Sequence, residues 1–160
     1  MAISVGDTIP DTEVLQIQDG TPVKLSTKEL LGDGRVVLFA VPGAFTRGCS
    51  TLHLPSFVNR AADLSAKGVD RIVCVSVNDA FVMNAWGQVQ GVGDQIVMAA
   101  DPRGEFTKAV GMEVDLPALG GLRSKRYAMV IENGMVTQFL PEEDGLSVLA
   151  STAECVLDVL

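Results

Sequence analysis

The stretch "RVVLFAVPGAFTRGCSTLHLPSFVNRAADLSAKG", residues 35–68, decides the fold. Its first seven residues, 35–41, form a continuous apolar run of the kind found in strands that are buried on both faces of a sheet. A short loop rich in proline and glycine follows, and residues 50–67 have the pattern of a helix that ends at Gly68. A buried strand followed by a helix predicts a parallel crossover, the unit from which α/β sheets are built.

The same alternation continues along the chain. "RIVCVSV", residues 71–77, and "QIVMAAD", residues 95–101, are predicted as two more buried strands. Helices are predicted over 79–89, with an aspartate at the start, and over 104–111. Strands that alternate with helices favour a sheet whose central strands are parallel.

Hairpins are predicted near both ends of the chain. Residues 12–25 contain two strands around Asp19-Gly20, and residues 126–140 contain two strands around Asn133-Gly134. Asp-Gly and Asn-Gly are the residue pairs that two-residue hairpin turns favour. The hairpins add antiparallel strands, so the sheet is predicted to be mixed.

Two short helices carry the signature of a capping box. Ser26 and Glu29 predict the start of a helix that ends at Gly32, and Ser151 and Glu154 predict a C-terminal helix. The chain is therefore predicted to be an α/β protein, with a mixed central sheet, helices on both faces and an N-terminal β-hairpin. Residues 1–160 have the length of one domain.

Composition excludes several classes of function. The net charge is −8, which argues against a nucleic-acid partner, and no apolar run is long enough to span a membrane. The first residues, "MAISVGDTIPD", lack the features of a signal peptide, so we expect a cytoplasmic protein. An organelle stays open as the alternative, because a transit peptide that has been removed would leave the same sequence.

The three cysteines, Cys49, Cys74 and Cys155, are an odd number without a CxxC pair. Disulfide frameworks of secreted proteins are even and dense, so this pattern favours a reducing compartment. One well-placed cysteine is then a candidate nucleophile or redox centre. The alternative is that all three are small buried hydrophobic residues.

Cys49 is the best-placed candidate. It lies where a loop enters a helix, and unpaired backbone N–H groups there favour the reactive thiolate. Gly43 and Gly48 allow close approach to a small substrate, Pro42 stiffens the loop, and Thr46 offers a hydroxyl. Ligand sites of α/β sheets lie at the carboxyl ends of the strands, where this loop is predicted. The alternative is an ordinary turn whose cysteine points inward.

The segment "PGAFTRGCSTLHLPSF" resembles the active site of the peroxiredoxins, which carry a Pro-x-x-x-Thr-x-x-Cys motif. Pro42, Thr46 and Cys49 match that motif. "VSVNDAFVMNAW", "DPRGEFTK" and "RSKRYAMVIENG" follow in the order of the type II branch, also called the peroxiredoxin five branch. The resemblance extends from "VGDTIPD" near the N-terminus to the C-terminal helix.

The resemblance implies a thioredoxin-like fold and a thiol-dependent peroxidase that reduces hydrogen peroxide and alkyl hydroperoxides. Cys49 would be the peroxidatic cysteine, which becomes a sulfenic acid. Thr46 would hold the peroxide, Pro42 would shield the thiolate, and the backbone N–H groups of Gly48 and Cys49 would act as donors. The family also implies a homodimer, with Phe45 and Phe81 as candidate contacts, and thioredoxin or glutaredoxin and glutathione as reductants.

An arginine is also needed to stabilise the thiolate and to polarise the peroxide, and by the resemblance it is Arg126 rather than Arg123. The alternative for Arg126 is a surface charge that precedes a strand. Arg47 stands where the family usually has proline, and it either acts on the thiol or faces solvent. Ser56 replaces a usual glycine, and we expect it to affect only local helix packing.

The sulfenic acid must be reduced by a second cysteine or by an outside thiol. Some similar proteins use a cysteine at the position of Cys74 as the resolving residue, but a cysteine in the middle of an apolar strand is equally expected to be structural. Cys155 is expected in the core of the C-terminal helix, and Val148 occupies the position of the resolving cysteine of the animal proteins.

Three other functions compete with the peroxidase. A thioredoxin-type reductase would need a cysteine at position 52, where the chain has Leu52. A cysteine hydrolase would need His53 as a base, although this histidine is rather expected to support the start of the helix by hydrogen bonding. A redox sensor or an interaction module without turnover stays open. The spacings of Cys49, His53, Cys74 and Cys155 do not fit a structural zinc site, and no organic cofactor is expected.

Overall fold

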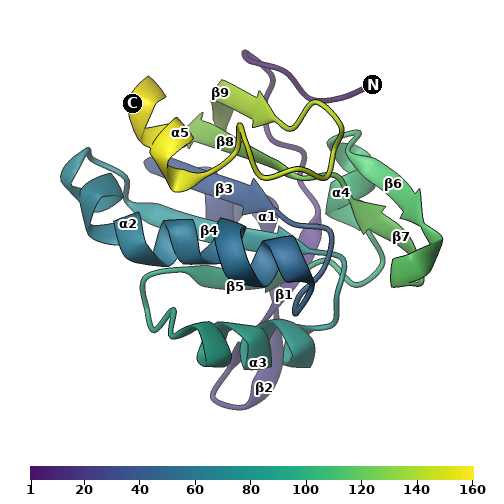
Figure 1. Ribbon diagram of the computed structural model, residues 1–160. Coiled ribbons are helices and arrows are strands. Elements are labelled where there is room, and N and C mark those ends of the chain that lie inside the picture. The colour runs from purple at the N-terminus through teal and green to yellow at the C-terminus, as the bar shows by residue number, and fades with distance from the viewer.

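A computed structural model describes residues 1–160, and Figure 1 shows a central sheet between two layers of helices. The seven strands are, in spatial order, β2 (Thr21–Ser26), β1 (Glu13–Gln18), β5 (Val97–Ala100), β4 (Arg71–Ser76), β3 (Arg35–Ala40), β8 (Tyr127–Glu132) and β9 (Met135–Pro141). Strands β3, β4 and β5 are parallel to one another, and the outer pairs are antiparallel. The predicted mixed sheet is therefore confirmed.

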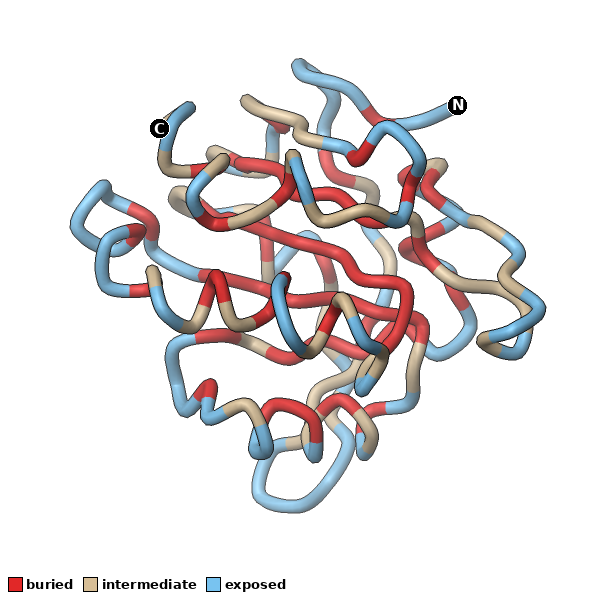
Figure 2. Tube along the Cα trace, in the orientation of Figure 1, coloured by how far each residue is buried: buried red, intermediate tan, exposed pale blue.

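The helices cover both faces of the sheet, as predicted. α2 (Leu54–Ala66), α3 (Ala80–Gln90) and α5 (Ala153–Val159) pack on one face, and α1 (Thr27–Leu31) and α4 (Glu105–Ala109) pack on the other. Each central strand contributes to both layers, because successive side chains point to opposite faces. In β3, Val37 and Phe39 belong to the core under α2, whereas Val36 and Leu38 belong to the core under α1. Figure 2 shows the resulting continuous burial along the central strands.

The turn residues adopt the conformations that their sequence predicts. Asp19 and Gly20 have φ of 51° and 78°, and Asn133 and Gly134 have φ of 50° and 84°. Positive φ at both central residues is the conformation of the turn that matches the twist of a hairpin. Ser26 caps α1 by accepting a hydrogen bond from the backbone N–H of Glu29, also as predicted.

Two features of the fold differ from the prediction. The C-terminal helix is capped by Thr152, whose hydroxyl accepts from the N–H of Cys155, so the prediction of Ser151 as the cap is wrong. Ser151 is instead committed to a buried carboxylate described below. The chain also forms a small antiparallel pair, β6 (Glu113–Leu116) and β7 (Gly121–Ser124), joined by the 3₁₀ turn Pro117–Leu119. It lies beside the main sheet in Figure 1 and had no counterpart in the predicted elements.

No helix of the structure combines the length and the apolar character that crossing a bilayer requires.

Candidate active site

The loop between β3 and the next helix is held from two sides. Asn78, which follows β4, accepts a hydrogen bond from the N–H of Ala44 at 2.9 Å. Arg123 of β7 donates to the carbonyls of Pro42, at 3.4 Å, and Val77, at 3.1 Å. The loop lies at the carboxyl ends of parallel strands β3 and β4, where the sheet topology predicts a site.

Cys49 lies near the start of the helix, at a point where the helix is wider than an α-helix. Residues Cys49–His53 form a π-helical turn, in which the carbonyl of Cys49 accepts from the N–H of Leu54. The predicted helix therefore exists, but it starts at Arg47, three residues earlier than predicted, and the sequence did not reveal its π-helical turn. Single π turns inside helices are rare and are frequent at functional sites. The thiol of Cys49 is fully buried beneath this turn.

Arg126 contacts Cys49 directly. Its Nη2 lies 3.1 Å from Cys49 Sγ, its Nη1 lies 2.8 Å from His53 Nδ1, and its Nε donates to the carbonyl of Leu146 at 2.9 Å. The side chain is only 3% exposed, and no carboxylate lies within ion-pair distance of it. Uncharged groups thus fix the guanidinium on two sides, and its charge faces the sulfur. The alternative of a surface charge is wrong.

His53 supports Arg126 rather than the start of its own helix. Its Nε2 lies 2.8 Å from the carbonyl oxygen of Ser151, which can only accept, so Nε2 carries the proton. Nδ1 is then free to accept the Nη1 hydrogen of Arg126. Burial, reinforced by the charge of Arg126, lowers the pKa of His53 to about 3 and keeps the ring neutral. The predicted support of the helix start is therefore wrong, because both partners of the ring lie elsewhere in the chain.

Thr46 and Pro42 lie in the loop as predicted. The hydroxyl of Thr46 donates to the carbonyl of Gly43 at 2.7 Å, so its lone pairs are left to accept a hydrogen bond from a substrate. Pro42 is buried, and Phe45 holds a positive φ of 63° with its ring half exposed. Arg47 is exposed, which agrees with the alternative that it faces solvent.

Gly48 lies directly beside the guanidinium. A Cβ atom at this position would lie 3.4 Å from Arg126 Nη2 and 3.5 Å from a methyl group of Val148. Larger side chains would therefore press on the arginine.

The other two cysteines differ sharply in their surroundings. Cys74 lies in β4 opposite Phe39 and is fully buried in the same core as Cys49. Burial, and secondarily the nearby Cys49, raises the pKa of the Cys74 thiol well above its usual value, although Arg126 acts in the opposite direction. Cys155 is half-buried, with its Sγ 3.4 Å from the carbonyl of Leu149, so the prediction that it packs in the core is wrong.

Sequence reasoning missed four hydrogen bonds that hold the helix. The indole N–H of Trp86 in α3 donates to Ser50 Oγ at 2.9 Å, and Gln90 donates to the Ser50 carbonyl at 3.2 Å. Ser56 donates to the carbonyl of His53 at 2.7 Å and accepts from the N–H of Ala153 at 3.1 Å, so it joins α2 to α5. A buried tryptophan needs an acceptor for its N–H, and this requirement was the only indication in the sequence of the Trp86 contact.

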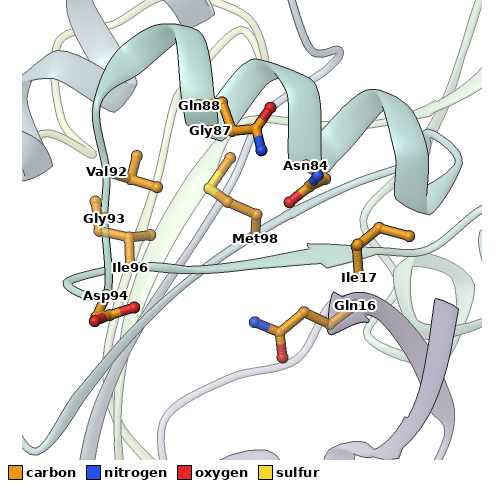
Figure 3. A pocket seen from close by; sticks show the side chains of 10 residues that line it. All are labelled: Gln16, Ile17, Asn84, Gly87, Gln88, Val92, Gly93, Asp94, Ile96 and Met98. Carbon is orange, nitrogen blue, oxygen red and sulfur yellow. The ribbon is translucent and has the colours of Figure 1, made fainter. Parts of the chain in front are cut away.

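A separate hollow of the surface lacks comparable chemistry. Figure 3 shows this hollow between α3 and strands β5 and β1, where mainly amide and aliphatic side chains and two glycines form the walls. Asp94 is its only ionisable residue. No group of three or more His, Cys, Asp or Glu side chains in the structure is arranged to hold a metal ion.

Comparison with known proteins identifies the class to which this fold and site belong. Residues 4–152 match the Redoxin family. The structure of reduced Prx3 from Vibrio vulnificus in complex with H₂O₂ superposes with a TM-score of 0.94, at 48% identity over 98% of each chain. The fold is therefore thioredoxin-like, and the protein is a thiol-dependent peroxidase.

Within that class, the chain belongs to the peroxiredoxins, and its relatives are of type II. Peroxiredoxin-2E, chloroplastic, from Arabidopsis thaliana is 44% identical over 99% of this chain and 70% of the relative. The structure of peroxiredoxin 5 from Alvinella pompejana is 35% identical, with a TM-score of 0.84 over 97% of this chain and 96% of that one. The family predicted from the loop motif is thus confirmed, and the enzyme reduces peroxides with electrons from thiols.

Proposed function

We propose that Cys49 is the peroxidatic nucleophile, and that Thr46, Pro42, Arg126 and the backbone N–H groups of Gly48 and Cys49 complete the catalytic site. The observation that carries this proposal is the 3.1 Å contact between Arg126 Nη2 and Cys49 Sγ. A buried guanidinium without a carboxylate partner favours a negative charge on the sulfur. It also favours the charge that develops on the peroxide during the reaction.

The reaction follows from these positions. The Cys49 thiolate attacks the terminal oxygen of ROOH, the S–O bond forms as the O–O bond breaks, and RO⁻ leaves and takes up a proton. The sulfur is oxidised to sulfenic acid, and the peroxide is reduced to ROH, or to water from H₂O₂. Negative charge moves from sulfur to the leaving oxygen, so Arg126, which reaches both, stabilises the transition state.

Thr46 and Pro42 prepare the substrate for this step. The Thr46 hydroxyl donates its hydrogen to the Gly43 carbonyl. Its oxygen therefore accepts a hydrogen bond from the O–H of the peroxide and directs the other peroxide oxygen toward the guanidinium. The buried ring of Pro42 keeps water from the thiolate. Holding both reactants in one geometry lowers the entropic part of the barrier.

An external thiol is the reductant that the surroundings of Cys74 favour. Thiolates, not thiols, attack a sulfenic acid, and burial holds the pKa of Cys74 well above its usual value. We therefore propose that thioredoxin, or glutaredoxin with glutathione, attacks the Cys49 sulfenic acid, releases water and forms a mixed disulfide that a second thiol resolves. Mass spectrometry after one equivalent of peroxide tests this. A Cys49–Cys74 disulfide would instead identify Cys74 as the resolving residue.

The peroxidase assignment to Cys49 is tested by substitution. Cys49→Ser should abolish reductant-dependent consumption of H₂O₂, while Cys155→Ser, at the half-buried cysteine, should retain it. Thioredoxin with its reductase and glutaredoxin with glutathione are supplied in separate assays, which identifies the reductant. Full turnover by Cys49→Ser would refute the mechanism.

We also propose that residues 1–160 act as one domain and assemble as a homodimer. Phe45 and Phe81 are 53% and 60% exposed, which suits residues that a partner subunit covers. Light scattering after size-exclusion chromatography should give twice the chain mass, and a monomer at micromolar concentration would contradict the proposal.

The compartment is proposed as cytoplasmic, with an organelle as the alternative. A relative at 44% identity carries the name chloroplastic, which supports the alternative and leaves the cytoplasmic prediction unconfirmed. Fractionation of the source cells, with an antibody against the chain, would decide between the two.

A further inference from the structure

We propose that Glu142 is a positioning residue for peroxide reduction, and that it acts on Arg126 through Ser151 and His53. The inference deepens the proposed function, since it rests on Cys49 and Arg126 as the reacting pair. Glu142 lies directly after β9 and has no counterpart among the residues that the sequence motif identifies.

The Glu142 carboxylate is buried and bound only by uncharged donors. Its side chain accepts from the backbone N–H groups of Leu149, Ala150 and Ser151, at 2.8 to 3.1 Å, and from the Ser151 hydroxyl at 2.5 Å. The residue is 5% exposed, and no lysine or arginine forms an ion pair with it. A buried charge is retained only where hydrogen bonds compensate its lost hydration, and here they come from one segment of the chain.

That segment depends on the carboxylate. The N–H groups of Leu149, Ala150 and Ser151 have no backbone acceptor, so Glu142 is their only partner. Ser151 is then held at both ends, because its N–H and hydroxyl bind Glu142 while its carbonyl faces His53 Nε2 at 2.8 Å. The carboxylate therefore determines where the Ser151 carbonyl points.

The position of the Ser151 carbonyl decides what His53 offers to Arg126. With a carbonyl at Nε2, the proton stays on Nε2 and the lone pair on Nδ1 accepts Nη1 of Arg126. Without that carbonyl, the proton is free to move to Nδ1, which would then repel the guanidinium. The backbone adds a second connection, because the N–H of Glu142 donates to the carbonyl of Arg126 at 3.1 Å.

Residues 142–151 also supply an acceptor for a second side of the guanidinium. Arg126 Nε donates to the carbonyl of Leu146, and the backbone N–H of Arg126 donates to the carbonyl of Gly145 at 2.7 Å. Two of the three side-chain contacts of Arg126 are thus set directly or indirectly by residues 142–151. The third is Cys49 itself.

If Glu142 only stabilised the loop, its replacement would change the kinetics differently than if Glu142 positions Arg126. Reaction of Cys49 with iodoacetamide needs an accessible thiolate, whereas reaction with H₂O₂ also needs donors aimed at the leaving oxygen. A misplaced guanidinium should therefore slow the peroxide reaction more than the alkylation. General loosening of the fold would not slow the peroxide reaction selectively.

The test compares Glu142→Gln with Glu143→Gln, which removes the same charge from the exposed neighbouring residue. The glutamine keeps the shape but sets an NH₂ group against backbone N–H donors. We expect the second-order rate constant for H₂O₂ to fall about tenfold in Glu142→Gln, the lower end of what removing an outer partner costs at metal sites. Alkylation should fall less than the peroxide reaction, because it loses only the stabilisation of the thiolate, and Glu143→Gln should match the wild type in both reactions.

A background substitution then tests the route through the arginine. In Arg126→Lys, Glu142→Gln should cause little further loss, because residues that act through one another are not additive. An unchanged peroxide reaction, an equal loss in both reactions, or a tenfold loss that persists in Arg126→Lys would each overturn the inference.

Two milder variants keep the inference testable if Glu142→Gln does not fold. Glu142→Asp retains the carboxylate and Ser151→Ala retains the charge, so each should show a smaller, still selective loss for H₂O₂. A loss that is not selective in both would overturn the inference. Full turnover by Cys49→Ser would instead refute the proposed function, so the two failures are distinguishable.

Discussion

Replacing His53 by glutamine should remove a pH dependence of stability that the wild-type protein has between pH 7 and pH 5. The native ring is neutral, because burial and Arg126 lower its pKa to about 3, whereas the unfolded chain has the ordinary value of 6.5. Below pH 6.5 the unfolded state therefore binds a proton that the native state does not. Stability is lost as the pH falls, and the loss continues until the folded pKa is reached.

The size of the effect follows from the two pKa values. For one group with these values, integrating the proton-binding difference from pH 7 to pH 5 gives a loss of about 2 kcal/mol in the free energy of unfolding. The unfolded value dominates the result, since the native ring stays neutral throughout this range. The side chain is buried, so solvent does not screen the effect.

The assay is urea unfolding of the wild type and His53→Gln at pH 7, 6 and 5. Glutamine keeps a carbonyl that accepts from Arg126 and an NH₂ that donates to Ser151, but it does not titrate. Other groups contribute equally to both proteins, so the difference between the two curves isolates His53. A difference that stays constant within about 0.5 kcal/mol across this range, against the 2 kcal/mol expected from linkage, would refute the neutral buried histidine.

Three further outcomes are expected. Ser56→Ala should lower the free energy of unfolding by about 1–2 kcal/mol, because it leaves the buried N–H of Ala153 without a partner, and Ser65→Ala on the exposed face of α2 should change it far less. Gly134→Ala should cost about 1–2 kcal/mol, since φ is 84° there, and unchanged urea midpoints would contradict this. In the folded enzyme at pH 8, iodoacetamide should leave Cys74 unmodified, which peptide mapping checks, because the thiol is buried and its pKa is raised.

The fold was predictable wherever the signal is local. The Asp-Gly and Asn-Gly pairs determine their hairpins through the backbone conformation of two residues, and the buried strands are continuous apolar runs. The pair β6 and β7 escaped prediction because each strand has only four residues and the pair contributes little to the main core. The choice of Thr152 over Ser151 as the cap depends on Glu142, whose carboxylate takes the Ser151 hydroxyl.

The site was predictable only as far as the motif extends. Cys49, Thr46 and Pro42 lie within eight residues of the chain, and their spacing carries the prediction. The contact of His53 with Arg126 joins residues 73 positions apart, and that of Glu142 with Ser151 depends on a loop conformation. No spacing in the sequence encodes such contacts, because the fold as a whole brings them together.

The hydrogen bond between Trp86 and Ser50 makes tryptophan fluorescence a probe of the helix that carries Cys49. Trp86 is the only tryptophan of the chain, and its indole N–H is bound to the residue next to Cys49. Any unwinding of the first helical turn breaks that bond and changes the polarity around the indole. A change in the emission spectrum of the unlabelled protein during turnover would therefore report unwinding of this turn, with no dye, tag or coupled reporter.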